Sequence, residues 1–192
     1  VEDVDVEAEI RDGRVGSILN ASGLASHVEY QKLAVEESRL GIPLLFGYDV
    51  VHGYETLFPI PLGEAASWNP GAAKEAASIA AAEAAAEGYH WSFGPPVDVT
   101  RDARWGRAME TSGEDPYLGS ELAAARVEGF QGDDLAATDT VLACAKHYAA
   151  YGEVKAGREY NTVDISESTL RDIHLPPFEA AVDAGVGTVM NA

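Results

Sequence analysis

The chain contains five short apolar runs that are separated by longer segments with a mixed composition. The runs cover residues 15–20, 42–49, 91–99, 141–148 and 186–192. Each run is continuously apolar and does not alternate with polar positions, which is typical of parallel strands buried on both faces. The pattern therefore predicts parallel strands, five in number, with helices between them.

The predicted helices between these strands cover residues 27–39, 70–88, 116–129 and a segment that starts after Asp164. The second and third helices open in the same way, because Asn69 and Asp115 are N-cap residues that precede a proline at the first helical position. In the fourth helix Glu167 completes a capping arrangement, and Pro176-Pro177 interrupts the helix. The predicted order of elements is βαβαβαβαβ.

This alternation fits either a closed (β/α)8 barrel or an open doubly wound sheet. The barrel is favoured by the polar residues that end successive runs, namely Asn20, Asp49, Asp98, Lys146-His147 and Asn191. In a barrel the carboxyl ends of the strands converge on one mouth, where active sites lie. We therefore predict an α/β fold in which residues 1–192 form one incomplete TIM-type barrel domain, since about five strands do not close a (β/α)8 barrel.

Charge narrows the class of partner. The chain has 13 basic and 32 acidic residues, which gives a formal net charge of −19. This charge repels phosphate backbones and anionic membrane surfaces, so neither nucleic acid nor a membrane is an expected partner. No segment reaches the about 18 to 20 continuous apolar residues of a membrane helix. The chain begins at Val1 with no signal-like segment, which leaves the compartment open.

Motifs for cofactors and metals do not occur. There is no GxGxxG after a strand, no P-loop, no HExxH, no paired CxxC and no GxSxG elbow, and the five histidines have no metal-ligand spacing. A single cysteine, Cys144, excludes an internal disulfide and lies within the apolar run VLACA, as expected of a buried core residue. We expect neither a cofactor nor a metal.

Asp49 directly follows the apolar run IPLLFGY. A carboxylate at the end of a buried strand loses hydration unless it is bonded, and its two oxygens would suit two vicinal sugar hydroxyls. An Asp that caps the next turn or pairs with an arginine would explain the position equally well. The residue type and spacing do not decide between these interpretations.

Lys146 and His147 end another buried strand, and neighbouring residues on a strand point to opposite sides unless the strand ends or bulges. A lysine that emerges from an apolar run needs a partner for its charge. By themselves such pairs are more often structural than catalytic. The segment 98–118 is rich in arginines and carboxylates, which either form solvated salt bridges or hold an anion or carboxylates at the mouth. Its charged residues are Arg101, Asp102, Arg104, Arg107, Glu110, Glu114 and Asp115.

Three segments together resemble glycoside hydrolase family 3, the family of β-glucosidases and related exo-acting enzymes. They are GIPLLFGYDVVHGYETLFPIPLGEAASWNP at 41–70, DVTRDARWGRAMETSGEDPYL at 98–118 and the segment 145–192, which begins AKHYAAYG. The resemblance implies a barrel-type first domain, a retaining double-displacement mechanism and a β-linked glucoside or oligosaccharide as substrate.

The same resemblance implies roles for four residues. Asp49 matches the sugar-binding aspartate before VHG, Arg107 matches the arginine of WGR, and Lys146 and His147 match the KH pair. Together they are implied to hold the sugar on the non-reducing side of the scissile bond. The nucleophilic aspartate is expected beyond Ala192 and the acid/base later still, so no catalytic carboxylate is expected in this chain, which alone should be inactive.

Two departures from the family pattern stand out. Many relatives have an arginine or another polar residue where this chain has Glu55, which we expect to point outward. The loop after KHYAAYG lacks the Asp-Ser-His arrangement of N-acetylglucosaminidases, which argues against that substrate. The preferred hypothesis is part of a β-glucosidase. The alternatives are a β-xylosidase or exo-glucanase of the same family, or a non-catalytic sugar-binding module.

Overall fold

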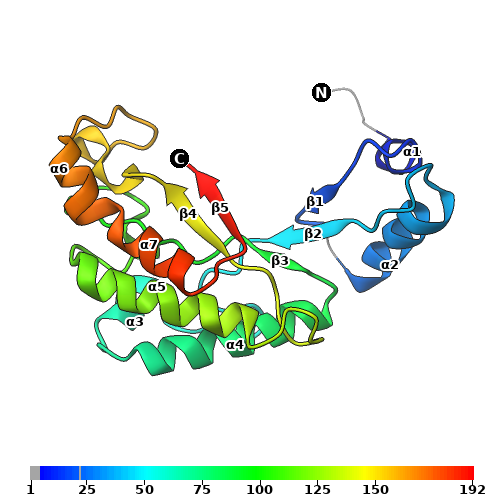
Figure 1. Ribbon diagram of the computed structural model, residues 1–192, viewed down its shortest axis with the longest axis horizontal. Helices are drawn as coiled ribbons and strands as arrows, with labels where there is room; N and C mark the ends of the chain where they lie inside the picture. Colours follow the sequence, from blue (N-terminus) through cyan, green and yellow to red (C-terminus); the bar gives the residue numbers. More distant parts are fainter. Residues whose placement is uncertain (1–4, 22) are drawn as a thin grey trace.

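The computed structural model describes residues 5–21 and 23–192 and consists of parallel strands connected by helices (Figure 1). The strands are β1 (Ser17–Leu19), β2 (Leu45–Tyr48), β3 (Trp91–Ser92), β4 (Cys144–Tyr148) and β5 (Thr188–Asn191). The α-helices are α1 (Val6–Arg11), α2 (Leu24–Lys32), α3 (Pro61–Ala65), α4 (Pro70–Ala86), α5 (Pro116–Gln131), α6 (Glu167–Thr169) and α7 (Pro176–Asp183). The predicted strands are confirmed in number and order, whereas the sequence pattern missed the short helices α1 and α3.

All of the strand pairs are parallel. β1, β2 and β3 are neighbours in one sheet, and β4 pairs with β5 in another. Isolated bridges between Trp91 and Leu142 and between Pro96 and Lys146 join the two sheets, so the strands follow one another in a single arc. Pro95 and Pro96 have no backbone N–H, and this explains why the third strand is so much shorter than the apolar run at 91–99.

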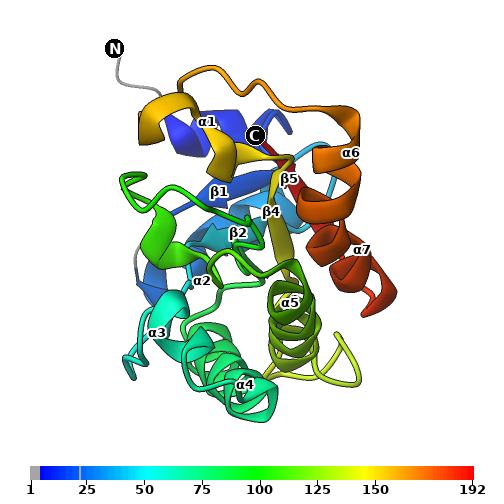
Figure 2. The same ribbon diagram turned by 90° about the vertical axis from the view of Figure 1, so that its left-hand side faces the viewer.

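The helices cover the outside of this arc. α4, α5 and α7 lie side by side in this order, with α5 in the middle (Figure 2). Four alanines of α4, Ala77, Ala80, Ala81 and Ala84, belong to the main core together with Val127 and Phe130 of α5. Gly129 makes the close approach of the two helices possible, because a Cβ atom at this position would lie 2.7 Å from the Cβ of Ala77.

The predicted N-caps are confirmed at α4 and α5, whereas α6 begins after Asp164, as predicted, but has a different cap. Asn69 accepts a hydrogen bond from the backbone N–H of Ala72 at 3.1 Å, and Asp115 accepts one from Leu118 at 2.9 Å. The N-cap of α6 is Ser166, whose hydroxyl accepts from the backbone N–H of Thr169. Asp164 does not begin the helix, because its carboxylate pairs with Lys155 at 3.0 Å in the preceding loop.

Helical turns of other types extend the α-helices. A π-helical turn, Leu33–Glu37, continues α2, and another, Leu170–His174, leads from α6 towards α7, which begins at Pro176. Three short 3₁₀ helices cover Ala108–Glu110, Tyr151–Glu153 and Lys155–Gly157. Within the described ranges, no helix is both long and apolar enough to cross a membrane.

Candidate functional site

The carboxyl ends of β2, β3 and β4 bring three of the predicted residues to one edge of the arc. Asp49 directly follows β2, and Lys146 and His147 lie in β4. The register between β4 and β5 shifts between Lys146 and Tyr148, an irregularity of the β-bulge type. Such an irregularity frees neighbouring side chains from strict alternation, so Lys146 and His147 both reach partners on neighbouring segments.

Lys146 and Asp49 form an ion pair. The Lys146 Nζ atom donates to Oδ1 of Asp49 at 2.6 Å. The lysine side chain is only 4% exposed, whereas that of Asp49 is 50% exposed. The predicted need of Lys146 for a partner is therefore confirmed. The pair has one buried side and one open side, so the carboxylate remains accessible to a ligand.

His147 is held by Asp98, which follows β3. Oδ2 of Asp98 accepts from the backbone N–H of His147 at 3.2 Å and contacts its Nδ1 at 2.8 Å. Both residues are buried, with 5% of Asp98 and 7% of His147 exposed. Since a carboxylate only accepts hydrogen bonds, Nδ1 carries the proton and Nε2 remains for another partner. The sequence pattern placed Asp98 at a strand end but did not identify this role.

Arg107 takes a partner that the sequence pattern did not foresee. Its Nε and Nη2 atoms each donate to Glu110 at 2.7 Å, in a bidentate pair that raises the pKa of the guanidinium and keeps it cationic. Its Cζ atom lies 5.7 Å from the ring centroid of Tyr151. In the described part of the chain, Lys146 is the only residue bonded to Asp49.

Two other arginines of the charged segment form salt bridges, one of them with a residue outside the segment. Arg104 pairs with Asp102 and Arg101 pairs with Glu153, each at 2.6 Å. These contacts agree with the interpretation of the segment as a charge-dense loop, in which exposed salt bridges contribute little to stability.

A depression of about 300 Å³ adjoins Asp49. Its lining consists of Asp49, Val51, His52, Gly53, Leu57, Pro61, Met109 and Glu110. It therefore connects the Asp49–Lys146 pair to the Arg107–Glu110 pair through one carboxylate of each. A volume of this size lies at the lower end of the range for small-molecule sites.

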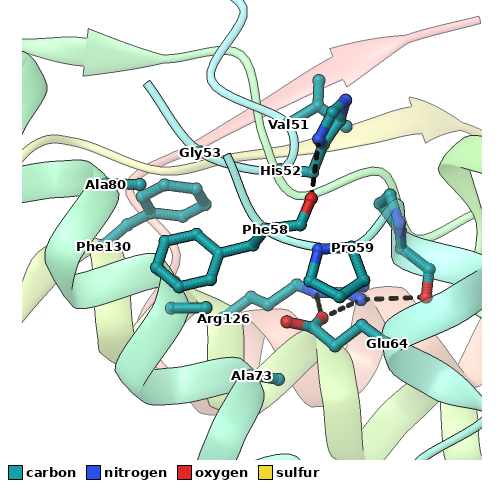
Figure 3. A pocket seen from close by; sticks show the side chains of 13 residues that line it. Val51, His52, Gly53, Phe58, Pro59, Glu64, Ala73, Ala80, Arg126 and Phe130 are labelled. Atoms are coloured by element: carbon teal, nitrogen blue, oxygen red, sulfur yellow. Dashed lines mark hydrogen bonds and ion pairs between the residues drawn. The ribbon is translucent and has the colours of Figure 1, made fainter. Parts of the chain in front are cut away.

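A second cavity has a different character (Figure 3). It measures about 20 Å³, and the rings of Phe58 and Phe130 lie beside it. Arg126 points towards Glu64, and its Nε donates to Oε2 at 2.8 Å. The side chains of this pair are 5% and 12% exposed. The cavity has room for about one water molecule and not for a sugar ring, so we assign it to the packing of α3 against α4 and α5.

The other residues singled out in the sequence have no side-chain hydrogen bond to Asp49, Lys146 or His147 among the described residues. Asn20 has a left-handed backbone (φ 55°), and the Asn191 side chain donates to the backbone of Ala192. Glu55 is exposed, as expected of an outward-pointing residue. Cys144 is a buried core residue, and burial raises the pKa of its thiol. Across the described residues, no group of three or more His, Cys, Asp and Glu side chains could hold a metal ion.

Comparison with known proteins identifies a family. The family model described as the glycosyl hydrolase family 3 N-terminal domain matches residues 2–192. A periplasmic β-glucosidase of Salmonella typhimurium is 46% identical over 183 residues, which are 95% of this chain and 24% of that protein. A β-xylosidase of Formosa agariphila is 38% identical over 193 residues, 93% of this chain and 27% of that protein.

Solved structures show the same similarity in three dimensions. A β-glucosidase of Listeria innocua in complex with glucose has a TM-score of 0.88 at 45% identity, over 92% of this chain and 25% of that chain. An exo-1,3/1,4-β-glucanase of Pseudoalteromonas has the same TM-score of 0.88 at 33% identity, over 98% of this chain and 27% of that chain. The barrel is thereby confirmed over the open sheet, and this chain spans about a quarter of the length of these relatives.

Proposed function

Because this chain belongs to glycosyl hydrolase family 3, we propose that it is the sugar-binding part of a retaining, exo-acting β-glucosidase. The substrate would be a terminal β-D-glucosyl residue of an oligosaccharide or glycoside. Residues 1–192 would form part of the N-terminal barrel domain. Support comes from the similarity to β-glucosidases of Salmonella typhimurium and Listeria innocua, the latter also solved with laminaribiose.

The proposal assigns the sugar hydroxyls to Asp49, Arg107, Lys146 and His147. Asp49 would accept hydrogen bonds from two hydroxyls, while the bond from Lys146 holds its carboxylate in position. His147 would use its free Nε2, because Asp98 occupies Nδ1. Charge-assisted hydrogen bonds to a neutral polyol contribute roughly 1.5–3 kcal/mol each, so a few of them select a sugar over water.

The observation that carries this proposal is the state of the carboxylates around the site. Retaining glycosidases need one carboxylate that attacks and one carboxylic acid, about 5 Å apart. Here Asp49 is bound to Lys146, Glu110 to Arg107 and Asp98 to His147. Each is occupied by a cationic or imidazole partner, which suits binding and positioning better than nucleophilic attack. We therefore place the nucleophile and the acid/base beyond Ala192.

The test uses the complete open reading frame that contains this segment. Its product should hydrolyse aryl β-glucoside with retention of configuration, faster than aryl β-xyloside, whereas the purified 192-residue chain should show no turnover. Hydrolysis by the short chain would refute the placement of the nucleophile. Sugar binding without any hydrolysis by the full product would instead support a non-catalytic module.

A β-xylosidase or an exo-glucanase is the alternative within the family. It is favoured by the 38% identity to the Formosa agariphila β-xylosidase and by the TM-score of 0.88 to the Pseudoalteromonas exo-glucanase. A clear preference of the full product for aryl β-xyloside, or for long glucans over aryl glucosides, would replace our choice.

A further inference from the structure

A loop that follows β4 folds back over the segment that carries Arg107. This loop, residues 154–163, is closed at its base by an antiparallel bridge between Val154 and Val163. Gly157 at its turn lies so close to the chain that a Cβ atom there would be 2.7 Å from the backbone nitrogen of Trp105. Figure 1 shows this part of the chain between β4 and α6. The loop is therefore packed against the WGR motif and does not extend freely into solvent.

Glu159 of this loop binds two aromatic side chains at once. Its Oε2 accepts from the indole Nε1 of Trp105 at 2.7 Å, and its Oε1 accepts from the hydroxyl of Tyr151. Burial and the neighbouring carboxylate raise the pKa of Tyr151, which keeps its hydroxyl protonated as the donor. The carboxylate thus joins three segments of the chain.

Tyr151 in turn contacts two of the proposed sugar-binding residues. Its ring lies under the guanidinium of Arg107, at 5.7 Å between Cζ and the ring centroid. The edge-to-face contact with the His147 ring has a centroid distance of 5.1 Å, and the contact with Trp105 has the same distance. Two side chains from different segments therefore contact one ring, whose hydroxyl is bonded to Glu159.

We propose that Glu159 is a positioning residue of the sugar site, which fixes the Trp105–Tyr151 pair and through it the orientation of Arg107 and His147. The inference rests on the proposed sugar-binding role of these two residues. Glu159 itself need not touch the sugar. It acts through the ring of Tyr151. Such an indirect effect can be large, because a displacement of about 1 Å in a binding group can lower a rate by about 10²-fold.

The experiment compares Glu159→Ala with Asp164→Ala in the product of the complete open reading frame. Asp164 is a matched control, because it belongs to the adjoining segment and forms an exposed ion pair with Lys155. For Glu159→Ala we expect kcat/KM on aryl β-glucoside to fall about tenfold, mostly through a higher KM, because the affected groups hold the sugar before and during reaction. Asp164→Ala should stay within about twofold of the unchanged enzyme.

A double-mutant cycle with Arg107→Lys separates positioning from general stability. If Glu159 acts through Arg107, the effect of Glu159→Ala on kcat/KM shrinks in the Arg107→Lys background, whereas independent effects multiply. Multiplicative effects, or a Glu159→Ala enzyme within about twofold of the unchanged one, would overturn the inference while leaving the proposed function intact. If the enzyme without any substitution has no glycosidase activity, both the proposed function and this inference are wrong.

A milder variant covers the case in which Glu159→Ala does not fold. Tyr151→Phe keeps the ring under Arg107 and removes only the hydroxyl that binds Glu159. We expect kcat/KM to fall about threefold to tenfold, because the ring keeps its packing under Arg107 but loses the bond to Glu159 that helps to hold it. An unchanged kcat/KM in Tyr151→Phe would overturn the inference.

Discussion

Two of the ion pairs described above have similar chemistry and different surroundings. Lys146 and Asp49 meet at the carboxyl ends of β2 and β4, where half of the aspartate side chain is exposed to a depression of about 300 Å³. Arg126 and Glu64 join α5 to α3 beside a cavity of about 20 Å³, with both side chains nearly buried. The comparison shows that the pairing of charges does not identify a site. The open face of one partner does.

The difference follows from which groups complete the hydrogen bonding. Arg126 also donates to the Ser112 hydroxyl, so protein atoms complete the hydrogen bonding of this pair on several sides. Asp49 receives one bond from Lys146 among the described residues, and its remaining lone pairs face the depression. An ion pair whose hydrogen bonds are all completed by protein atoms stabilises the fold. A pair with unused hydrogen-bond acceptors can bind a polar ligand.

The largest expected effect is on stability, from Glu64→Ala. This change leaves the Arg126 guanidinium buried and unpaired, so the free energy of unfolding should fall by about 3–5 kcal/mol, measured by urea denaturation of the full-length product. A double replacement, Glu64→Leu with Arg126→Met, serves as control and should recover most of the loss, because no charge is then buried. A Glu64→Ala protein as stable as the unchanged one would show that the two pairs do not differ as described.

The next largest effect is on activity, from Asp49→Ala. Loss of the hydroxyl contacts should lower kcat/KM on aryl β-glucoside by the equivalent of about 1.5–3 kcal/mol, read from steady-state kinetics. This is less than the sum of two such bonds, because water in the open depression can replace the carboxylate as a partner of the hydroxyls. The loss of stability should be smaller than for Glu64→Ala, because removal of the half-exposed Asp49 side chain would let water from the depression reach the buried ammonium of Lys146. If activity survives near the unchanged level, the role carried over to Asp49 is wrong.

The smallest effect concerns a buried histidine outside both pairs. Burial lowers the pKa of His174, whose ring lies 3.6 Å from Glu153. The unfolded chain therefore takes up a proton first as the pH falls through the unperturbed value of about 6.5, and stability is lost from there towards the lower folded pKa. Unfolding measured between about pH 7.5 and 5 should show this loss, and His174→Gln should reduce its slope. An unchanged slope would exclude His174 as its source.

Local sequence determined the regular elements of this protein. Continuous apolar runs define buried parallel strands, and Asn69 and Asp115 begin α4 and α5 because their side chains bind backbone N–H groups only three residues away. The same local reasoning found that a helix begins after Asp164 but not its cap, which is Ser166. The family motifs indicated Asp49, Lys146 and His147, and the fold brings these three residues to one edge.

Only the tertiary structure decided how those residues are paired. Asp98 and His147 are far apart in the chain, and nothing local reveals that β3 and β4 lie side by side and bring them to 2.8 Å. The choice of Glu110 by Arg107 and the link of Glu159 to Trp105 and Tyr151 depend equally on how the loops fold over the strand ends. Sequence fixes residue type and short-range geometry, whereas desolvation and long-range contact, which turn a charged residue into a binding group, exist only once the chain has folded.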